Sequence, residues 1–178
     1  MLYKKIYIEN LDAIKRQSLD LFPTDYYSKN TLFYIDNNQE QFFNIEPLNQ
    51  FLEDSCLKKN VVGFGFYITQ PNTTGGIHTD TGSFDYSLNI PISGCEESSV
   101  CFYDCYHLPI YKKLSETVGY NSYAHAVCRE IDSFKFTDPY IINVKVPHRV
   151  VNNKNSIRIS LLIRLSNLDN MSGTASRN

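Results

Sequence analysis

From Val61 onward the chain consists of short apolar runs separated by turn residues, and this pattern restricts the fold more than any other feature. It predicts strands at 61–69, around His78, and at 86–92, 99–104, 130–136, 140–152 and 157–165. In the last strand the odd-numbered positions are all apolar and share one face, whereas Arg158 and Ser160 lie on the other. Short strands in this number are typical of a double-sheet jelly roll.

The first 60 residues have a different pattern. They predict a strand at 3–9, a helix at 11–22 that Pro23 ends, a strand at 31–35 and a second helix at 41–56 with an irregularity at Pro47. Both helices are amphipathic, so each needs an apolar surface to lie on. The expected fold is mainly β with flanking helices: a double-stranded β-helix (jelly roll, cupin-like) with the N-terminal helices packed on one sheet.

A chain of 178 residues predicts a single domain. Residues 1–60 form the supporting part of this domain (1–166) and 61–166 its jelly-roll core. We expect a partly helical insertion at 106–129 and a disordered tail at 167–178, where the residues are small and polar.

Charge and cysteine content narrow the partners and the compartment. The net charge is −2 without a long Lys/Arg run, so nothing indicates a nucleic-acid or membrane surface. No apolar stretch approaches the roughly 20 residues of a membrane span, and the N-terminus lacks the apolar core of a signal peptide. The five cysteines are odd in number and irregularly spaced, and Cys56 and Cys128 have no obvious partner. This argues against a disulfide scaffold and favours a reducing, cytoplasmic location.

His78-Thr79-Asp80 is the first chemically informative motif. In a strand, residues two apart point to the same face, so His78 and Asp80 can reach one metal ion while Thr79 points away. Taken alone the motif is weak, because a turn at Asp80-Thr81-Gly82 also explains it. A third ligand must come from a distant strand.

His148 is the candidate for that third ligand. It follows Pro147 and, on a continuous strand, would share a face with Ile142, Val144 and Val146, at the mouth of an apolar-walled pocket. Arg158 follows ten positions later and Ser160 two positions after that. An arginine facing the interior of a small barrel is energetically unfavourable unless it meets an anion.

The order H-x-D, then His148, then Arg158-x-Ser160 resembles the Fe(II)/2-oxoglutarate-dependent oxygenases, over roughly residues 61–165. The sequence around Pro147-His148 and Leu88-Asn89-Ile90-Pro91 is most similar to small phage-type or aspartyl/asparaginyl-hydroxylase-like members. The resemblance implies that His78, Asp80 and His148 hold Fe(II) as a 2-His-1-carboxylate triad. It also implies that Arg158 and Ser160 bind the distal carboxylate of 2-oxoglutarate, assisted by Tyr67 and Asn89.

The implied activity is an O2-dependent hydroxylation that releases succinate and CO2. The substrate would be a peptide side chain or a small amino-acid-like metabolite, and a homodimer is an open expectation. Two other functions remain: a non-haem iron oxygenase or cupin metalloenzyme that does not use 2-oxoglutarate, and a non-catalytic jelly-roll binding module. Arg149 is a poorer anion ligand than Arg158 because it points away from its neighbour His148, and Arg164 is poorer because it lies too far along the strand. Cys101-x3-Cys105-x-His107 does not match a common zinc spacing.

Overall fold

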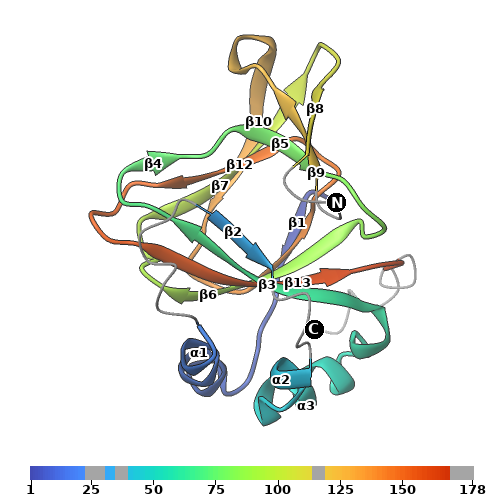
Figure 1. The fold of residues 1–178 in the computed structure, drawn as a ribbon, viewed down its shortest axis with the longest axis vertical. Helices are drawn as coiled ribbons and strands as arrows, with labels where there is room; N and C mark the ends of the chain where they lie inside the picture. Colours follow the sequence, from blue (N-terminus) through green and yellow to red (C-terminus); the bar gives the residue numbers. More distant parts are fainter. Residues whose placement is uncertain (23–30, 35–39, 114–118, 169–178) are drawn as a thin grey trace, which may run out of the picture.

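The computed structural model describes residues 1–22, 31–34, 40–113 and 119–168. Within them the chain forms two antiparallel sheets around a common interior (Figure 1). The six-stranded sheet has the order β1-β11-β6-β13-β3-β2, and the seven-stranded sheet has the order β10-β7-β12-β5-β9-β8, with β4 paired to β12. This arrangement confirms the expected jelly-roll fold with flanking helices.

The strands of the six-stranded sheet are β1 (Tyr3–Lys5), β2 (Thr31–Tyr34), β3 (Val61–Thr69), β6 (Tyr86–Ser93), β11 (Tyr140–Asn143) and β13 (Arg158–Leu165). Those of the seven-stranded sheet are β4 (Thr73–Thr74), β5 (Ile77–Asp80), β7 (Ser98–Cys105), β8 (Ile110–Lys113), β9 (Gly119–Tyr123), β10 (Cys128–Lys135) and β12 (His148–Asn152). The helices are α1 (Leu11–Asp20), α2 (Glu40–Phe43) and α3 (Glu46–Asp54), with 3-10 turns at Lys58–Asn60 and His125–Val127.

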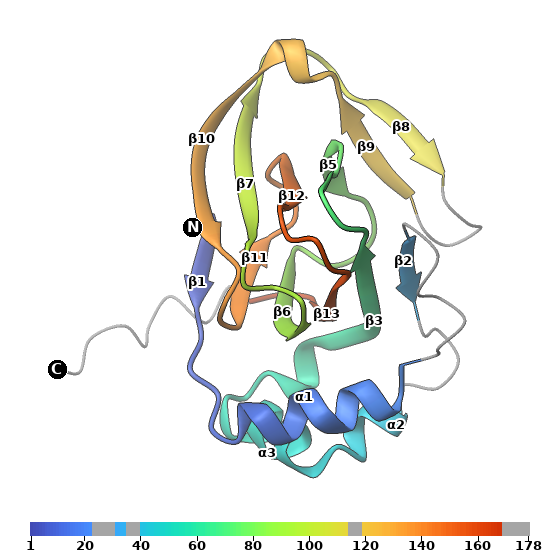
Figure 2. The ribbon, with the colours of Figure 1, turned by 90° about the vertical axis from the view of Figure 1, so that its left-hand side faces the viewer.

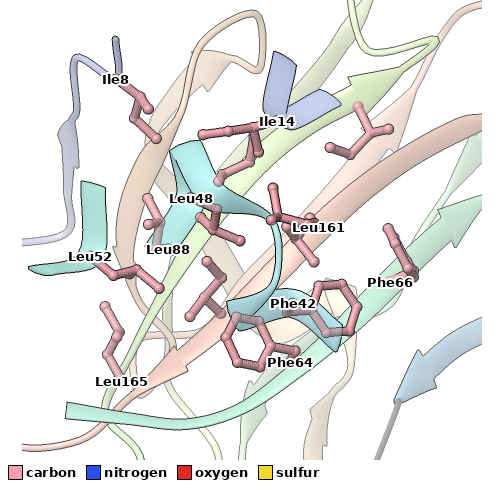
Figure 3. Packing of buried hydrophobic residues seen from close by; sticks show 14 of the residues in the cluster. Ile8, Ile14, Phe42, Leu48, Leu52, Phe64, Phe66, Leu88, Leu161 and Leu165 are labelled. Carbon is pink, nitrogen blue, oxygen red and sulfur yellow. The ribbon is translucent and has the colours of Figure 1, made fainter. Parts of the chain in front are cut away.

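The helices cover the outer face of the six-stranded sheet, as the amphipathic pattern predicted. Figure 2 shows them gathered at one end of the molecule, beneath β3, β6 and β13. Ile14 of α1 and Leu48 and Leu52 of α3 are fully buried and belong to the same core cluster as Leu88 and Leu161 of the sheet (Figure 3). Burying each such side chain contributes about 1.5–3 kcal/mol.

A second core lies between the two sheets. It contains Phe102 and Phe134 from the seven-stranded sheet and Tyr140 and Ile142 from the six-stranded one. Tyr3 of β1 joins this cluster: its ring centroid is 4.5 Å from that of Phe134, which in turn stacks on Tyr140 at 4.0 Å. The aromatic contacts thus join the two sheets where β1 and β10 lie side by side.

The predicted strand at 140–152 is not continuous. β11 ends at Asn143, and β12 begins at His148 in the other sheet, so residues 144–147 carry the chain from one sheet to the other. The apolar pattern of residues 140–152 does not reveal this change of sheet, because β11 and β12 both bury alternate residues in the same interior. The second predicted helix is likewise two helices, α2 and α3, with Pro47 at the start of α3.

Three further expectations differ from the structure. The 3–9 strand is limited to Tyr3–Lys5, and the 106–129 insertion is not partly α-helical in its described residues: it contains β8, β9 and a single 3-10 turn. The predicted tail falls mostly on residues 169–178, outside the described residues, but Leu168 is buried in the helix-side core. Among the residues described, no helix is both long and apolar enough to cross a membrane.

Candidate metal centre

His78 and Asp80 lie on β5, and His148 is the first residue of β12. The antiparallel pairing places His148 directly opposite His78, so both side chains leave the same face of the sheet. One potential ligand atom from each of the three residues lies within 4.8 Å of the other two. Thr79 points to the opposite face, where its Oγ1 accepts a hydrogen bond of 3.3 Å from Asn121. The structure therefore brings the predicted ligands together with the predicted strand parity.

Both imidazoles are held in one tautomer. The Nδ1 of His78 lies 2.9 Å from the carbonyl oxygen of Gly76, and the Nδ1 of His148 lies 2.9 Å from that of Val146. A carbonyl oxygen only accepts, so each Nδ1 must carry the proton and donate it. In a neutral ring held this way Nε2 is the atom that can bind a metal, which is the usual orientation of a metal-binding histidine.

His148 is also kept neutral by its surroundings. Its side chain is only 4% exposed. Burial, followed by the nearby His78, lowers the pKa of His148 from 6.5 to about 4. A neutral imidazole at physiological pH is the form that binds a metal ion.

Arg158 lies in the same pocket, on the six-stranded sheet. It is 2% exposed, and its guanidinium carbon is 4.5 Å from the centroid of the Phe136 ring and 5.7 Å from that of Tyr67. Its Nε donates to Ser98 Oγ at 3.2 Å, but its buried Nη1 has no hydrogen-bond partner among the described residues. No described carboxylate is within ion-pair distance, so the site has a buried positive charge that an anion would complement.

These groups line one pocket of about 60 Å3 between the sheets. A single water molecule requires roughly 10–15 Å3, so the pocket has room for a small ligand. All seven predicted site residues line it: His78, Asp80, His148, Arg158, Ser160, Tyr67 and Asn89. The remaining lining side chains are mostly apolar: Val100, Ile142, Val144, Val150, Leu162 and Ser87.

The two ends of the pocket belong to different sheets. His78, Asp80 and His148 are on the seven-stranded sheet, whereas the other four predicted residues are on the six-stranded sheet. Ser160 is fully buried and its Oγ is 3.5 Å from the Tyr67 carbonyl oxygen. Asn89 accepts a hydrogen bond of 3.3 Å from Ser87. Burial raises the pKa of Tyr67, so its phenol remains protonated and can donate.

The competing arginines lie outside the pocket. Arg149 is on the outer side of β12 with its guanidinium carbon 5.1 Å from the Tyr103 ring, and that of Arg164 lies 4.6 Å from the Phe84 ring. Sequence reasoning did not identify Ser98 or Phe136 as partners of Arg158. Alternation would place Phe136 inward, but no local signal links either residue to an arginine far along the chain.

One expectation about the cysteines was wrong. Cys128, for which we found no partner, forms a disulfide with Cys105, and the two residues are directly paired on β10 and β7. The cysteine spacing therefore no longer supports a reducing compartment. Cys105 is also unavailable to a zinc ion, whereas Cys56, Cys95 and Cys101 are free thiols.

No protein-family model and no curated protein sequence matches the chain. Solved structures do share its fold. AviO1 from Streptomyces viridochromogenes Tue57 superposes with a TM-score of 0.52 at 14% identity, covering 99% of this chain and 92% of that one. The non-heme monooxygenase ThoJ gives 0.51 at 8% identity, covering 92% and 74%. A prolyl-4-hydroxylase from Pseudomonas putida gives 0.47 at 12% identity, covering 93% and 86%. The chain thus has a fold that is also found in a non-heme monooxygenase.

Proposed function

We propose that this protein is a mononuclear non-haem Fe(II) oxygenase that uses 2-oxoglutarate as cosubstrate. One observation carries the proposal: a single pocket combines a His-His-Asp cluster with a buried arginine that has no counter-ion among the described residues. Two imidazoles and one carboxylate are the ligand set of the facial triad of non-haem iron oxygenases. A dicarboxylate would occupy both ends of such a pocket.

The residues present fit both groups. His78, Asp80 and His148 would hold Fe(II), since both Nδ1 atoms donate to carbonyl oxygens and leave Nε2 to the metal, and His148 stays neutral above its pKa of about 4. Arg158 would bind the distal carboxylate in a charge-assisted hydrogen bond, with Ser160 and Tyr67 as further donors. Asn89 lines the same pocket and would be a further polar contact for 2-oxoglutarate.

When bound, Fe(II) and 2-oxoglutarate would supply the oxidising chemistry, in which one atom of O2 goes to succinate, with loss of CO2, and the other to the substrate. The protein contributes position and shielding. The walls of the pocket are apolar and would limit access of water to the reacting groups; they consist of Val100, Ile142, Val144, Val150 and Leu162. The substrate would be a peptide side chain or a small amino-acid-like metabolite.

Anaerobic titration tests the proposal most directly. Adding Fe(II) and then 2-oxoglutarate to the protein should give the weak visible charge-transfer band of the chelate, and Fe(II) alone should not. His78→Ala and Asp80→Ala should lose both this band and substrate-independent succinate formation. Thr79→Ala is the matched control, because Thr79 lies between the two ligands but points to the opposite face. Unchanged succinate formation in His78→Ala or Asp80→Ala would contradict the triad.

A second candidate function follows from the same buried arginine. Arg158 and Ser160 would complement the carboxylate of a substrate equally well, in an iron oxygenase that does not use 2-oxoglutarate. The stoichiometry separates the two: one succinate per hydroxylated product is expected with 2-oxoglutarate, and none without it.

A further inference from the structure

The guanidinium of Arg158 is held by a residue of the opposite sheet. Ser98 is the first residue of β7 and precedes Arg158 by 60 positions, yet its Oγ lies 3.2 Å from Arg158 Nε. The two residues are 1% and 2% exposed. Where water is excluded, a hydrogen bond to a charged group is strong and its geometry is well defined.

The Ser98 hydroxyl can only accept from Arg158. Its single proton is already donated to the carbonyl oxygen of Cys95 at 2.7 Å, and the Ser98 amide donates to the same oxygen at 3.0 Å. A guanidinium Nε–H cannot accept, so the direction of the Arg158–Ser98 bond is fixed. The turn at Cys95 therefore presets the hydroxyl before any ligand arrives.

Two contacts together determine the orientation of the guanidinium. Ser98 holds Nε, and the Phe136 ring lies 4.5 Å from the guanidinium carbon. Rotation about the bond to Nε would break the first contact or lose the second. Nη1, in contrast, has no hydrogen-bond partner in the described part of the chain, although it is buried.

We propose that Ser98 is a positioning residue for the anion end of the site: it fixes Arg158 so that the unpaired Nη1 is available to the distal carboxylate of 2-oxoglutarate. This inference rests on the proposed function. Ser98 does not line the pocket, so it acts through Arg158 and not on the ligand itself. A preorganised arginine loses less conformational freedom when the carboxylate binds, which increases affinity.

The test measures 2-oxoglutarate binding to Mn(II)-loaded protein by calorimetry, where no turnover occurs. Ser98→Ala should raise the Kd by up to about tenfold, because binding must then order an Arg158 side chain that is no longer held in place. Ser98→Cys is the second variant, for use if Ser98→Ala folds poorly. Its side chain is close in size to serine but accepts hydrogen bonds only weakly, so it should show the same loss of 2-oxoglutarate affinity. The control is Ser99→Ala, whose hydroxyl lies on the opposite face near Cys101; it should bind as the wild type does.

Two further measurements distinguish positioning from a general structural role. With Fe(II), Ser98→Ala should raise the KM for 2-oxoglutarate by up to about tenfold and change kcat less than about twofold, since a saturated site is already ordered. In an Arg158→Lys background, which lacks the Nε–H, Ser98→Ala should change the Kd less than about twofold. The inference about Ser98 would be wrong, with the proposed function intact, if the losses of affinity in Ser98→Ala and Arg158→Lys were fully additive. It would also be wrong if both Ser98 variants bound 2-oxoglutarate with the wild-type Kd. Failure of the wild type to bind 2-oxoglutarate would overturn it together with the proposed function.

Discussion

His78 and His148 are paired directly across the antiparallel strands β5 and β12, and their ring centroids lie 4.5 Å apart. The register of the sheet therefore sets the separation of the two imidazoles, and Asp80 follows on the same strand face. A ligand set built on paired strands is held more accurately than one built on loops.

The buried, neutral His148 makes the stability of the metal-free protein depend on pH. Its pKa is about 4 in the folded state and 6.5 when unfolded, so between these values the unfolded chain binds the extra proton. The stabilisation is complete above pH 6.5 and is lost as the pH falls towards 4. We expect the free energy of unfolding to decrease by about 3 kcal/mol over this range.

Urea denaturation of metal-free protein at several pH values measures this effect. His148→Asn should remove most of the slope between pH 6.5 and 4. His107→Asn is the control, because His107 is exposed and its removal should leave the slope intact. An equal slope in wild type and His148→Asn would assign the pH dependence to other groups.

Arg158 should lower the stability of the ligand-free protein, because its buried charge has no described counter-ion. Replacement by methionine keeps much of the volume and removes the charge. Arg158→Met should therefore unfold at higher denaturant concentration than the wild type, by about 1 kcal/mol or more, while losing 2-oxoglutarate binding. Adding 2-oxoglutarate should raise the Tm of the wild type only. A large destabilisation of Arg158→Met would contradict this account of the charge.

Asn152 should be essential for the end of the pocket that contains Arg158. It is fully buried, and its Nδ2 donates to the carbonyl oxygens of Thr69, Gln70 and Ser156, which join β3, β12 and the turn before β13. The two Nδ2 protons are shared among these three carbonyl oxygens, and Oδ1 accepts from the Lys154 amide at 3.2 Å, so Asn152→Ala should destabilise the protein by about 3 kcal/mol, roughly 1 kcal/mol for each of three bonds. The exposed neighbour Asn153 serves as control in the same chemical denaturation series, and Asn153→Ala should change stability by less than about 0.5 kcal/mol.

The Cys105–Cys128 disulfide should stabilise the fold without supporting the pocket. It closes a segment of 23 residues, for which chain entropy predicts about 3 kcal/mol. The double variant Cys105→Ser/Cys128→Ser should lose this amount but retain 2-oxoglutarate affinity, because neither cysteine lines the pocket. Cys56→Ser, which removes a free exposed thiol, should alter neither quantity. Equal unfolding curves with and without reductant would argue that the bond does not form in solution.

The core beneath the helices should respond strongly to truncation. Leu48 is fully buried and packs against the six-stranded sheet. Leu48→Ala should therefore lower the free energy of unfolding by about 2–5 kcal/mol. Leu19, on the same side of the molecule but 36% exposed, provides the matched leucine. Leu19→Ala should cost less than 1 kcal/mol in the same measurement.

Local periodicity was sufficient to predict the faces of strands. It placed His78 and Asp80 on one face of β5, and it separated Arg158 and Ser160 from the apolar residues that lie under the helices. Both predictions need only the two-residue repeat of a strand. The same rule could not show that the chain leaves one sheet after Asn143 and enters the other at His148, because both segments bury alternate residues.

The remaining features depend on contacts between residues far apart in sequence. Cys105 meets Cys128, and Ser98 meets Arg158, only after β7 has paired with β10 and the two sheets have closed on each other. The insertion that contains β8 and β9 has few apolar residues with a clear period. Its strands are therefore defined by pairing, of β9 with β5 and of β8 with β9, and not by local preference.

The placement of the two pocket ends on separate sheets has a consequence for ligand choice. In the proposed complex a ligand must reach from the His-Asp cluster to Arg158, so the separation of the sheets limits the length of the ligand. The aromatic contacts of Tyr3, Phe134 and Tyr140 join the two sheets and so restrict changes in their separation. Under the proposed function, a dicarboxylate with one carbon fewer or more than 2-oxoglutarate is therefore expected to bind more weakly.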